Sequence, residues 1–151
     1  MDPILLPVGL LMAIYTPSVK MNEILIVDDD RTVCRCLERL INWEALGYNR
    51  PRIAYSGTEA MKWIESGFVP NVVLTDIRMP LMNGVMLAEK IREQYPNIQI
   101  VFFSAYEDFE AAQAGIQYGV KRYIMKPINR ESLRNVEQTL QAIAVELKTE
   151  D

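Results

Sequence analysis

Five polar side chains that could act together in chemistry each follow a short apolar run of the sequence. They are Asp28, Asp29, Asp76, Ser104 and Lys126. Continuous apolar runs of this length are typical of strands that are buried on both faces of a parallel sheet. A charge at the end of such a strand is costly unless a function or a partner holds it there, and ligands of open α/β sheets bind at this edge. Asp76 is therefore the first candidate for a reactive group.

The types of these residues predict a site for a phosphoryl group. Carboxylates crowded together at Asp28, Asp29 and Asp76 would repel one another, and a divalent cation with oxygen ligands, such as Mg²⁺, relieves that repulsion. Lys126 offers a positive charge for an anion, and Ser104 offers a hydroxyl donor. In such a site a nucleophilic Asp76 would form an acyl phosphate.

Alternating strand and helix patterns supply the scaffold for these residues. We expect strands at 24–27, 51–55, 72–75, 98–103 and 122–125. Helices are expected from a cap at Asp30 to Gly47, at 59–66, 85–95 and 109–118, and from a cap at Asn129 to about residue 148. The short connections between alternating elements predict an α/β fold, a doubly wound parallel sheet with five strands and five helices.

The composition limits the classes of function. The chain has 151 residues, 50% of them hydrophobic and 24% charged, which suits one globular domain with a proper core. Its net charge of −4 and the absence of a long basic run argue against direct nucleic-acid binding by this chain. Because the chain has no His, a His metal site, a Ser-His triad or a phosphohistidine would have to come from a partner.

The cysteines and the N-terminal segment bear on location. Cys34 and Cys36 lie two residues apart on an expected helix, which suits neither zinc nor a disulfide and indicates a reduced, cytoplasmic protein. The apolar stretch 3–15 is too short to span a membrane, which needs about 20 residues. We interpret residues 1–20 as an extension ahead of a natural start at Met21, and an added strand or an apolar docking arm is the alternative.

The five side chains also lie in motifs with a specific spacing. The motifs are Val27-Asp28-Asp29, Asp76-Ile77-Arg78-Met79-Pro80 with Gly84, Ser104-Ala105 and Lys126-Pro127. With these motifs the chain resembles the receiver domain of a two-component response regulator over residues 21–148, with 149–151 as a C-terminal tail. The resemblance implies a flavodoxin-like sheet with strand order 2-1-3-4-5 and a sensor histidine kinase as the partner.

The resemblance also implies a role for each site residue. Asp76 would be the phosphoacceptor, and Ser104 and Lys126 would contact the phosphoryl oxygens. The ligands of Mg²⁺ would be Asp28, acting largely through water, Asp29, Asp76 and the backbone carbonyl of Arg78.

A second set of residues would transmit and tune the signal. Tyr123 matches the aromatic switch of the family and would turn inward as Ser104 moves toward the phosphoryl group; a plain core or edge aromatic is the alternative. The family more often has Thr where Ser104 stands; Ser104 keeps the hydroxyl, and we expect the missing methyl group to loosen the coupling to Tyr123. The bulky Arg78 and Tyr106 flank the expected site, where we expect them to restrict water and lengthen the phosphoryl lifetime; simple surface exposure is the alternative.

Two further segments narrow the resemblance. Residues 41–48 and 104–110 are similar to receivers that precede AraC-type DNA-binding domains, which would control transcription, and only three residues follow Lys148 here. The chain is thus expected to be a receiver without its output domain, or one that works alone through protein contacts. The last helix carries an apolar seam that either faces the core or extends into a dimer, at Leu133, Val136, Leu140, Ile143 and Leu147. We expect a phosphorylation-dependent homodimer through the last helices.

Other classes of protein fit less well. A phosphatase of the haloacid-dehalogenase type needs an acid two residues after its nucleophile, where this chain has Arg78. A flavodoxin needs a phosphate cradle rich in hydroxyl groups and Gly, where this chain has three Asp residues at 28–30. An interaction domain that no longer accepts phosphate stays open. We expect a switching module rather than an enzyme with a diffusible substrate.

Overall fold

The computed structural model describes residues 20–106 and 108–149, and its five strands form one parallel sheet. The strands are β1 (Ile24–Val27), β2 (Arg52–Ala54), β3 (Val72–Thr75), β4 (Gln99–Ser104) and β5 (Arg122–Met125). Their order is β2-β1-β3-β4-β5, which confirms the predicted order. In this register Val27 lies opposite Thr75, and Ser104 lies opposite Met125. The residues that follow β1 and β3 therefore leave the sheet at the same level.

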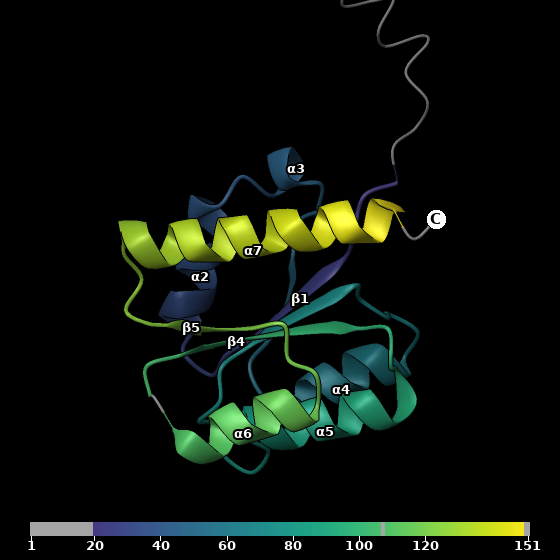
Figure 1. Cartoon of the computed structure of the whole chain (residues 1–151), viewed down its shortest axis with the longest axis vertical. Coiled ribbons are helices and arrows are strands. Elements are labelled where there is room, and N and C mark those ends of the chain that lie inside the picture. Colours follow the sequence, from purple (N-terminus) through teal and green to yellow (C-terminus); the bar gives the residue numbers. More distant parts are fainter. Residues whose placement is uncertain (1–19, 107, 150–151) are drawn as a thin grey trace, which may run out of the picture.

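Helices cover both faces of the sheet. They are α2 (Arg31–Leu40), α3 (Trp43–Leu46), α4 (Gly57–Glu65), α5 (Gly84–Gln94), α6 (Phe109–Gln117) and α7 (Arg130–Thr149). Figure 1 shows α2, α3 and α7 on one side of the sheet and α4, α5 and α6 on the other. This arrangement confirms the doubly wound fold.

The sequence predicted one helix where the structure has α2 and α3, so the described residues hold six helices and not five. Asn42 is responsible for the break, because its side chain accepts a hydrogen bond from the Ala45 backbone (3.2 Å) and starts a new helix. The Trp43 indole donates to the Glu38 carbonyl (3.3 Å), one of the carbonyls left open where α2 ends. Gly47 closes α3 in the left-handed region (φ 92°), where glycine is favoured.

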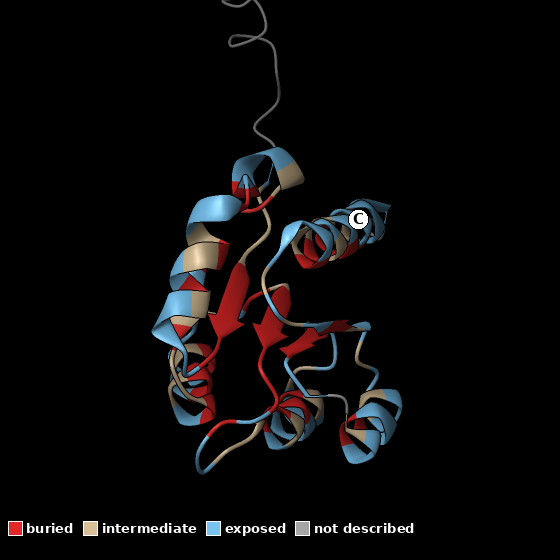
Figure 2. Cartoon of the chain, turned by 90° about the vertical axis from the view of Figure 1, so that its left-hand side faces the viewer, coloured by how far each residue is buried: buried red, intermediate tan, exposed pale blue. Residues whose placement is uncertain are grey.

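Buried apolar side chains fill the space between the sheet and its helices. All four residues of β1 and of β3 are buried, as expected for central parallel strands, and Figure 2 shows these strands in red. On the α7 side, Val136, Leu140 and Ile143 are fully buried, while Leu133 and Leu147 are partly buried against the same cluster. The apolar seam of the last helix therefore faces the core.

Two predicted caps are confirmed. The Asp30 carboxylate accepts hydrogen bonds from the backbone of Thr32 and Val33 at the start of α2. The Asn129 side chain accepts one from Ser132 (2.9 Å) at the start of α7. These caps fix where each helix begins relative to the sheet edge that carries Asp28 and Lys126.

The expectations for residues 1–19 lie outside the described residues, as do those for 150–151. Within the described part, no helix combines the length and the apolar character needed to cross a membrane.

Candidate functional site

Three carboxylates meet where β1 and β3 end, as predicted. One oxygen from each of Asp28, Asp29 and Asp76 lies within 4.8 Å of the others. Asp28 is 2% exposed and Asp76 is 8% exposed, whereas Asp29 is open to solvent. Oxygen donors of this kind, with one side facing water, fit a hard divalent cation that keeps several water ligands.

Lys126 joins this cluster from the end of β5. Its Nζ lies 2.7 Å from Asp28 Oδ2 and 3.4 Å from Asp76 Oδ2. Burial raises the pKa of Asp28, although the hydrogen bond from Lys126 opposes the shift. Burial alone would lower the pKa of Lys126, but the hydrogen bond and the negative charges of Asp28 and Asp76 raise it overall. Lys126 is therefore charged at neutral pH and partly offsets the repulsion between the carboxylates.

Backbone contacts fix the orientation of the two buried carboxylates. Asp76 Oδ1 accepts a hydrogen bond from the Ile77 backbone (2.8 Å), and Asp28 Oδ1 accepts one from the Asp30 backbone (2.9 Å). The Thr75 hydroxyl donates to the Asp76 carbonyl (2.8 Å). Each carboxylate thus has one oxygen held by the backbone, and the second oxygen of each is the one near Lys126.

Gly84 closes the loop that follows Asp76. Its backbone N–H donates to the Ile77 carbonyl (2.7 Å), and a Cβ at this position would fall on the Asp76 carbonyl oxygen and lie 2.9 Å from Ile77 Cα. The sequence analysis placed Gly84 in the same motif as Asp76 but did not predict this contact between them. The structure shows that the start of α5 rests directly on the backbone of Asp76.

Ser104 and Tyr123 lie on the two neighbouring strands β4 and β5. Ser104 is fully buried at the end of β4, and its hydroxyl accepts a long hydrogen bond from the Tyr106 backbone (3.4 Å). Tyr123 is half-buried and meets the Phe102 ring edge to face, with 6.1 Å between the ring centroids. The Tyr123 hydroxyl oxygen is itself buried. The ring of Tyr123 is thus packed inward in this structure.

Arg78 and Tyr106 contact each other beside the acidic cluster. The Arg78 guanidinium lies over the Tyr106 ring, 4.1 Å from its centroid, and Arg78 Nη2 lies 3.8 Å from an Asp108 carboxylate oxygen. Asp108 caps α6 and was missed by the sequence reasoning, because nothing local links it to Arg78. These contacts connect the loop after β3 with the loop after β4.

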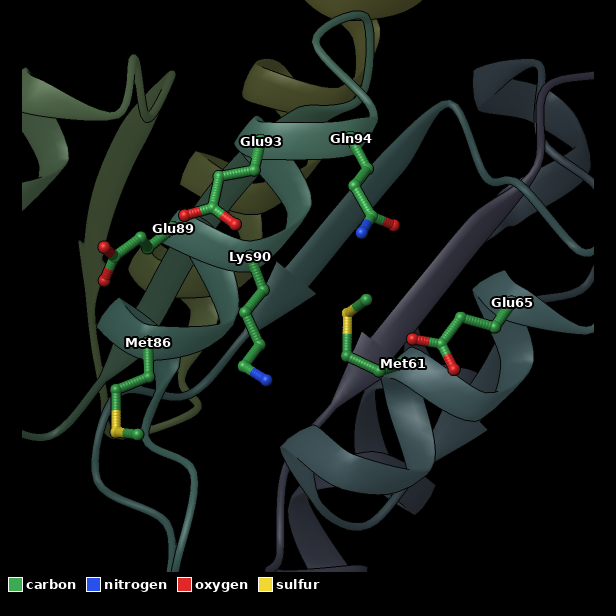
Figure 3. A pocket seen from close by; sticks show the side chains of 7 residues that line it. All are labelled: Met61, Glu65, Met86, Glu89, Lys90, Glu93 and Gln94. Carbon is green, nitrogen blue, oxygen red and sulfur yellow. The ribbon is translucent and has the colours of Figure 1, made fainter.

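Two surface grooves differ in their relation to this site. An apolar one adjoins it and is lined by Thr32, Val33, Cys36, Ala105, Lys126, Pro127 and Ile128. Another, between α4 and α5, is shown in Figure 3 and is lined by Met61, Glu65, Met86, Glu89, Lys90, Glu93 and Gln94. The second groove contains none of the predicted site residues, whereas the first contains Lys126.

A doubly wound sheet thus carries an acidic cluster and a lysine at its carboxyl edge. Residues 24–138 match the family described as the response regulator receiver domain, so the chain belongs to this family of signalling modules rather than to the enzymes that turn over a substrate. This confirms the resemblance drawn from the motifs.

The relatives include transcriptional regulators. The chain is 35% identical over 131 residues to YesN, a transcriptional regulatory protein of Bacillus subtilis (strain 168), covering 87% of this chain and 34% of YesN. It is 36% identical over 113 residues to HptR, a transcriptional regulatory protein of Staphylococcus aureus (strain NCTC 8325 / PS 47), covering 75% of this chain and 44% of HptR. The chain therefore spans less than half the length of these curated relatives.

A solved structure supports the narrower likeness. The two-component transcriptional regulator AraC from Clostridium phytofermentans ISDg superimposes with a TM-score of 0.69 and 34% identity, covering 86% of this chain and 99% of that one. The likeness to receivers of AraC-type regulators is thus confirmed.

Proposed function

We propose that Asp76 accepts a phosphoryl group from a phosphohistidine of a sensor histidine kinase. The observation that carries this proposal is the buried Asp76 carboxylate, which shares one site with Asp28, Asp29 and Lys126. A carboxylate oxygen of Asp76 attacks the phosphorus, the P–N bond breaks, and its electron pair stays on the imidazole nitrogen. Lys126 then faces the anionic group that has been formed, and the Ser104 hydroxyl donates to one of its oxygens.

The residues that would hold Mg²⁺ are Asp28, Asp29, Asp76 and the backbone carbonyl of Arg78, with Asp28 acting largely through water. When bound, the ion supplies positive charge to the oxygens of the transferred group. The donor set supports this assignment, because three carboxylate oxygens within 4.8 Å of one another leave excess negative charge that Lys126 alone does not balance.

The phosphoryl group would act as a switch by shifting a population. It adds charge and hydrogen-bond acceptors at Asp76, which favour a state with Ser104 drawn toward the phosphoryl group. The family resemblance expects Tyr123 to turn inward in that state, but its ring is already packed against Phe102 in this structure, so phosphorylation would hold it there rather than move it. The change would reach the surface of α6, β5 and α7, where a phosphorylation-dependent homodimer would form.

The output would be transcription, through a DNA-binding domain of the kind that the longer relatives suggest, while this chain itself would not contact nucleic acid. Cys34 is buried and Cys36 is half-buried, and neither forms a disulfide within the described residues, which suits a cytoplasmic location. The apolar groove beside Lys126 offers the kinase a surface next to the acceptor.

The direct test is the intact mass of the chain after incubation with acetyl phosphate, with and without Mg²⁺. We expect wild type to gain the mass of one phosphoryl group only with Mg²⁺, and Asp76→Asn to gain none. Asp108→Asn serves as the matched control, since this carboxylate caps α6 outside the cluster, and it should be labelled like wild type. Labelling of Asp76→Asn, or no labelling of wild type under any condition, would refute the proposal.

A further inference from the structure

Leu81 combines a rare backbone conformation with almost complete exposure. Its φ is 68°, and among the described residues it is the only one other than glycine with a positive φ. Leu81 is also 96% exposed. Leucine seldom adopts this left-handed region. The Met82 backbone donates to the Pro80 carbonyl (2.8 Å), so Leu81 stands at the centre of a γ-turn, and the form with positive φ is strained.

The neighbours of Leu81 hold this turn in place. On one side Met79 is buried. On the other, the Met82 side chain packs against Gly57 of α4 so closely that a Cβ there would lie 2.8 Å from Met82 Cγ. Strain of this kind persists only when the surroundings determine the conformation. The packing of its neighbours therefore holds Leu81 in this exposed position.

The loop that carries Leu81 belongs to the acceptor site. It leaves the sheet at Asp76 and returns to it where Gly84 rests on the Asp76 carbonyl. Since these 151 residues contain no His, a phosphohistidine that reaches Asp76 must be carried by a domain outside them. Asp76 is 8% exposed, so a protein that brings its phosphorus within bonding distance must also cover the rim of the site.

We propose that Leu81 is an apolar contact residue for the domain of the sensor kinase that carries the phosphohistidine. This inference rests on the proposed function and names one residue of its partner surface. A leucine held rigidly in solvent loses little conformational freedom when a partner covers it, so its burial favours association. A small phosphodonor has no protein surface to place on Leu81, so its reaction with Asp76 should not depend on this residue.

The test compares two donors on variants of position 81. The donors are acetyl phosphate and the phosphorylated histidine-bearing domain of a sensor kinase chosen because it labels the wild-type chain. Leu81→Asn should fold, because Asn tolerates positive φ, and Leu81→Met keeps an apolar side chain. Val69→Asn is the matched control, an exposed apolar residue in the loop that enters β3 at the opposite edge.

We expect Leu81→Asn to lower the rate constant of transfer from the kinase domain about tenfold, within the range of a single contact residue. Leu81→Met and Val69→Asn should stay within about twofold of wild type. All variants should be labelled by acetyl phosphate at the wild-type rate. The inference is overturned if Leu81→Asn accepts the group from the kinase domain as fast as wild type does, or if acetyl phosphate labels it equally slowly. If acetyl phosphate does not label wild type and no sensor kinase domain that labels it can be found, the proposed function is instead refuted.

Discussion

At the scale of single residues, the contact between Arg78 and Tyr106 has a consequence for how long a phosphoryl group would remain on Asp76. Arg78 and Tyr106 lie two residues after Asp76 and Ser104, respectively, and the Arg78 guanidinium is 4.1 Å from the centroid of the Tyr106 ring. The Arg78 side chain is 58% exposed, so its ion pair with Asp108 at 3.8 Å is worth little in stability. Its effect is expected instead on the access of water to the aspartyl phosphate.

We expect the double variant Arg78→Ala/Tyr106→Ala to lose its phosphoryl group about tenfold faster than wild type, equivalent to about 1.4 kcal/mol of barrier. The physical reason is that smaller side chains admit water along the line opposite the leaving carboxylate. The measurement is the decay of the phosphorylated mass after the phosphodonor is removed. Arg50→Ala, which removes an exposed guanidinium paired with Glu38, is the control and should decay like wild type. Unchanged decay of the double variant would contradict this role.

At the scale of elements, the position of α5 depends on the close approach of its first residue to the acceptor strand. Gly84 is buried and its N–H is bonded to Ile77, so the helix starts directly against the backbone that carries Asp76. Any side chain at this position would have to push the helix away from the strand. The same contact is the reason why the intervening loop, with Leu81 at its turn, has so little freedom.

Gly84→Ala should lower the free energy of unfolding by about 2 kcal/mol, because the added methyl group meets backbone atoms that cannot move aside. Gly115→Ala is the matched control, since a Cβ there would lie 3.6 Å from Val120 Cβ, an ordinary contact. Within α6 this second change should be neutral or stabilising by up to about 1 kcal/mol. Urea denaturation of both variants and wild type measures the difference. If Gly84→Ala were as stable as wild type, the prediction would be wrong, because the loop between Asp76 and Gly84 could then shift to accommodate the added methyl group.

At the scale of the whole molecule, the face formed by α6 and β5 is the part of the surface on which the proposed homodimer depends. Phe109 is 75% exposed, Ile116 is 85% exposed and Met125 is 40% exposed. The apolar seam of α7 is committed to the core, so a dimer would use the exposed side chains of α6 and β5 together with the outer surface of α7.

We expect sedimentation velocity to show a shift from monomer toward dimer when the chain is phosphorylated with acetyl phosphate and Mg²⁺. Ile116→Asp should weaken this dimer at least about tenfold, because it places a charge in the apolar contact, while leaving phosphoryl occupancy unchanged. Val69→Asp, at an exposed apolar position outside α6 and β5, should dimerise like wild type. If phosphorylated Ile116→Asp formed the dimer at the same protein concentration as wild type, the dimer contact would lie outside the surface around Ile116.

The sequence by itself determined the strands, their order through the family resemblance, the caps at Asp30 and Asn129, and the polar residues at the strand ends. These depend on local patterns, in which apolar runs, turn residues and capping side chains act over a few positions. The one helix predicted up to Gly47 was wrong because the competing cap at Asn42 was not recognised.

Only the tertiary structure decided which atoms meet. Lys126 and Asp28 are 98 positions apart and form a 2.7 Å contact, and no local pattern fixes such a distance. The same holds for the contact of Arg78 with Asp108 and for that of Met82 with Gly57, which leaves Leu81 exposed in a strained turn. These features arise from packing between elements. A loop adopts a strained conformation only when the elements packed around it exclude its unstrained conformations.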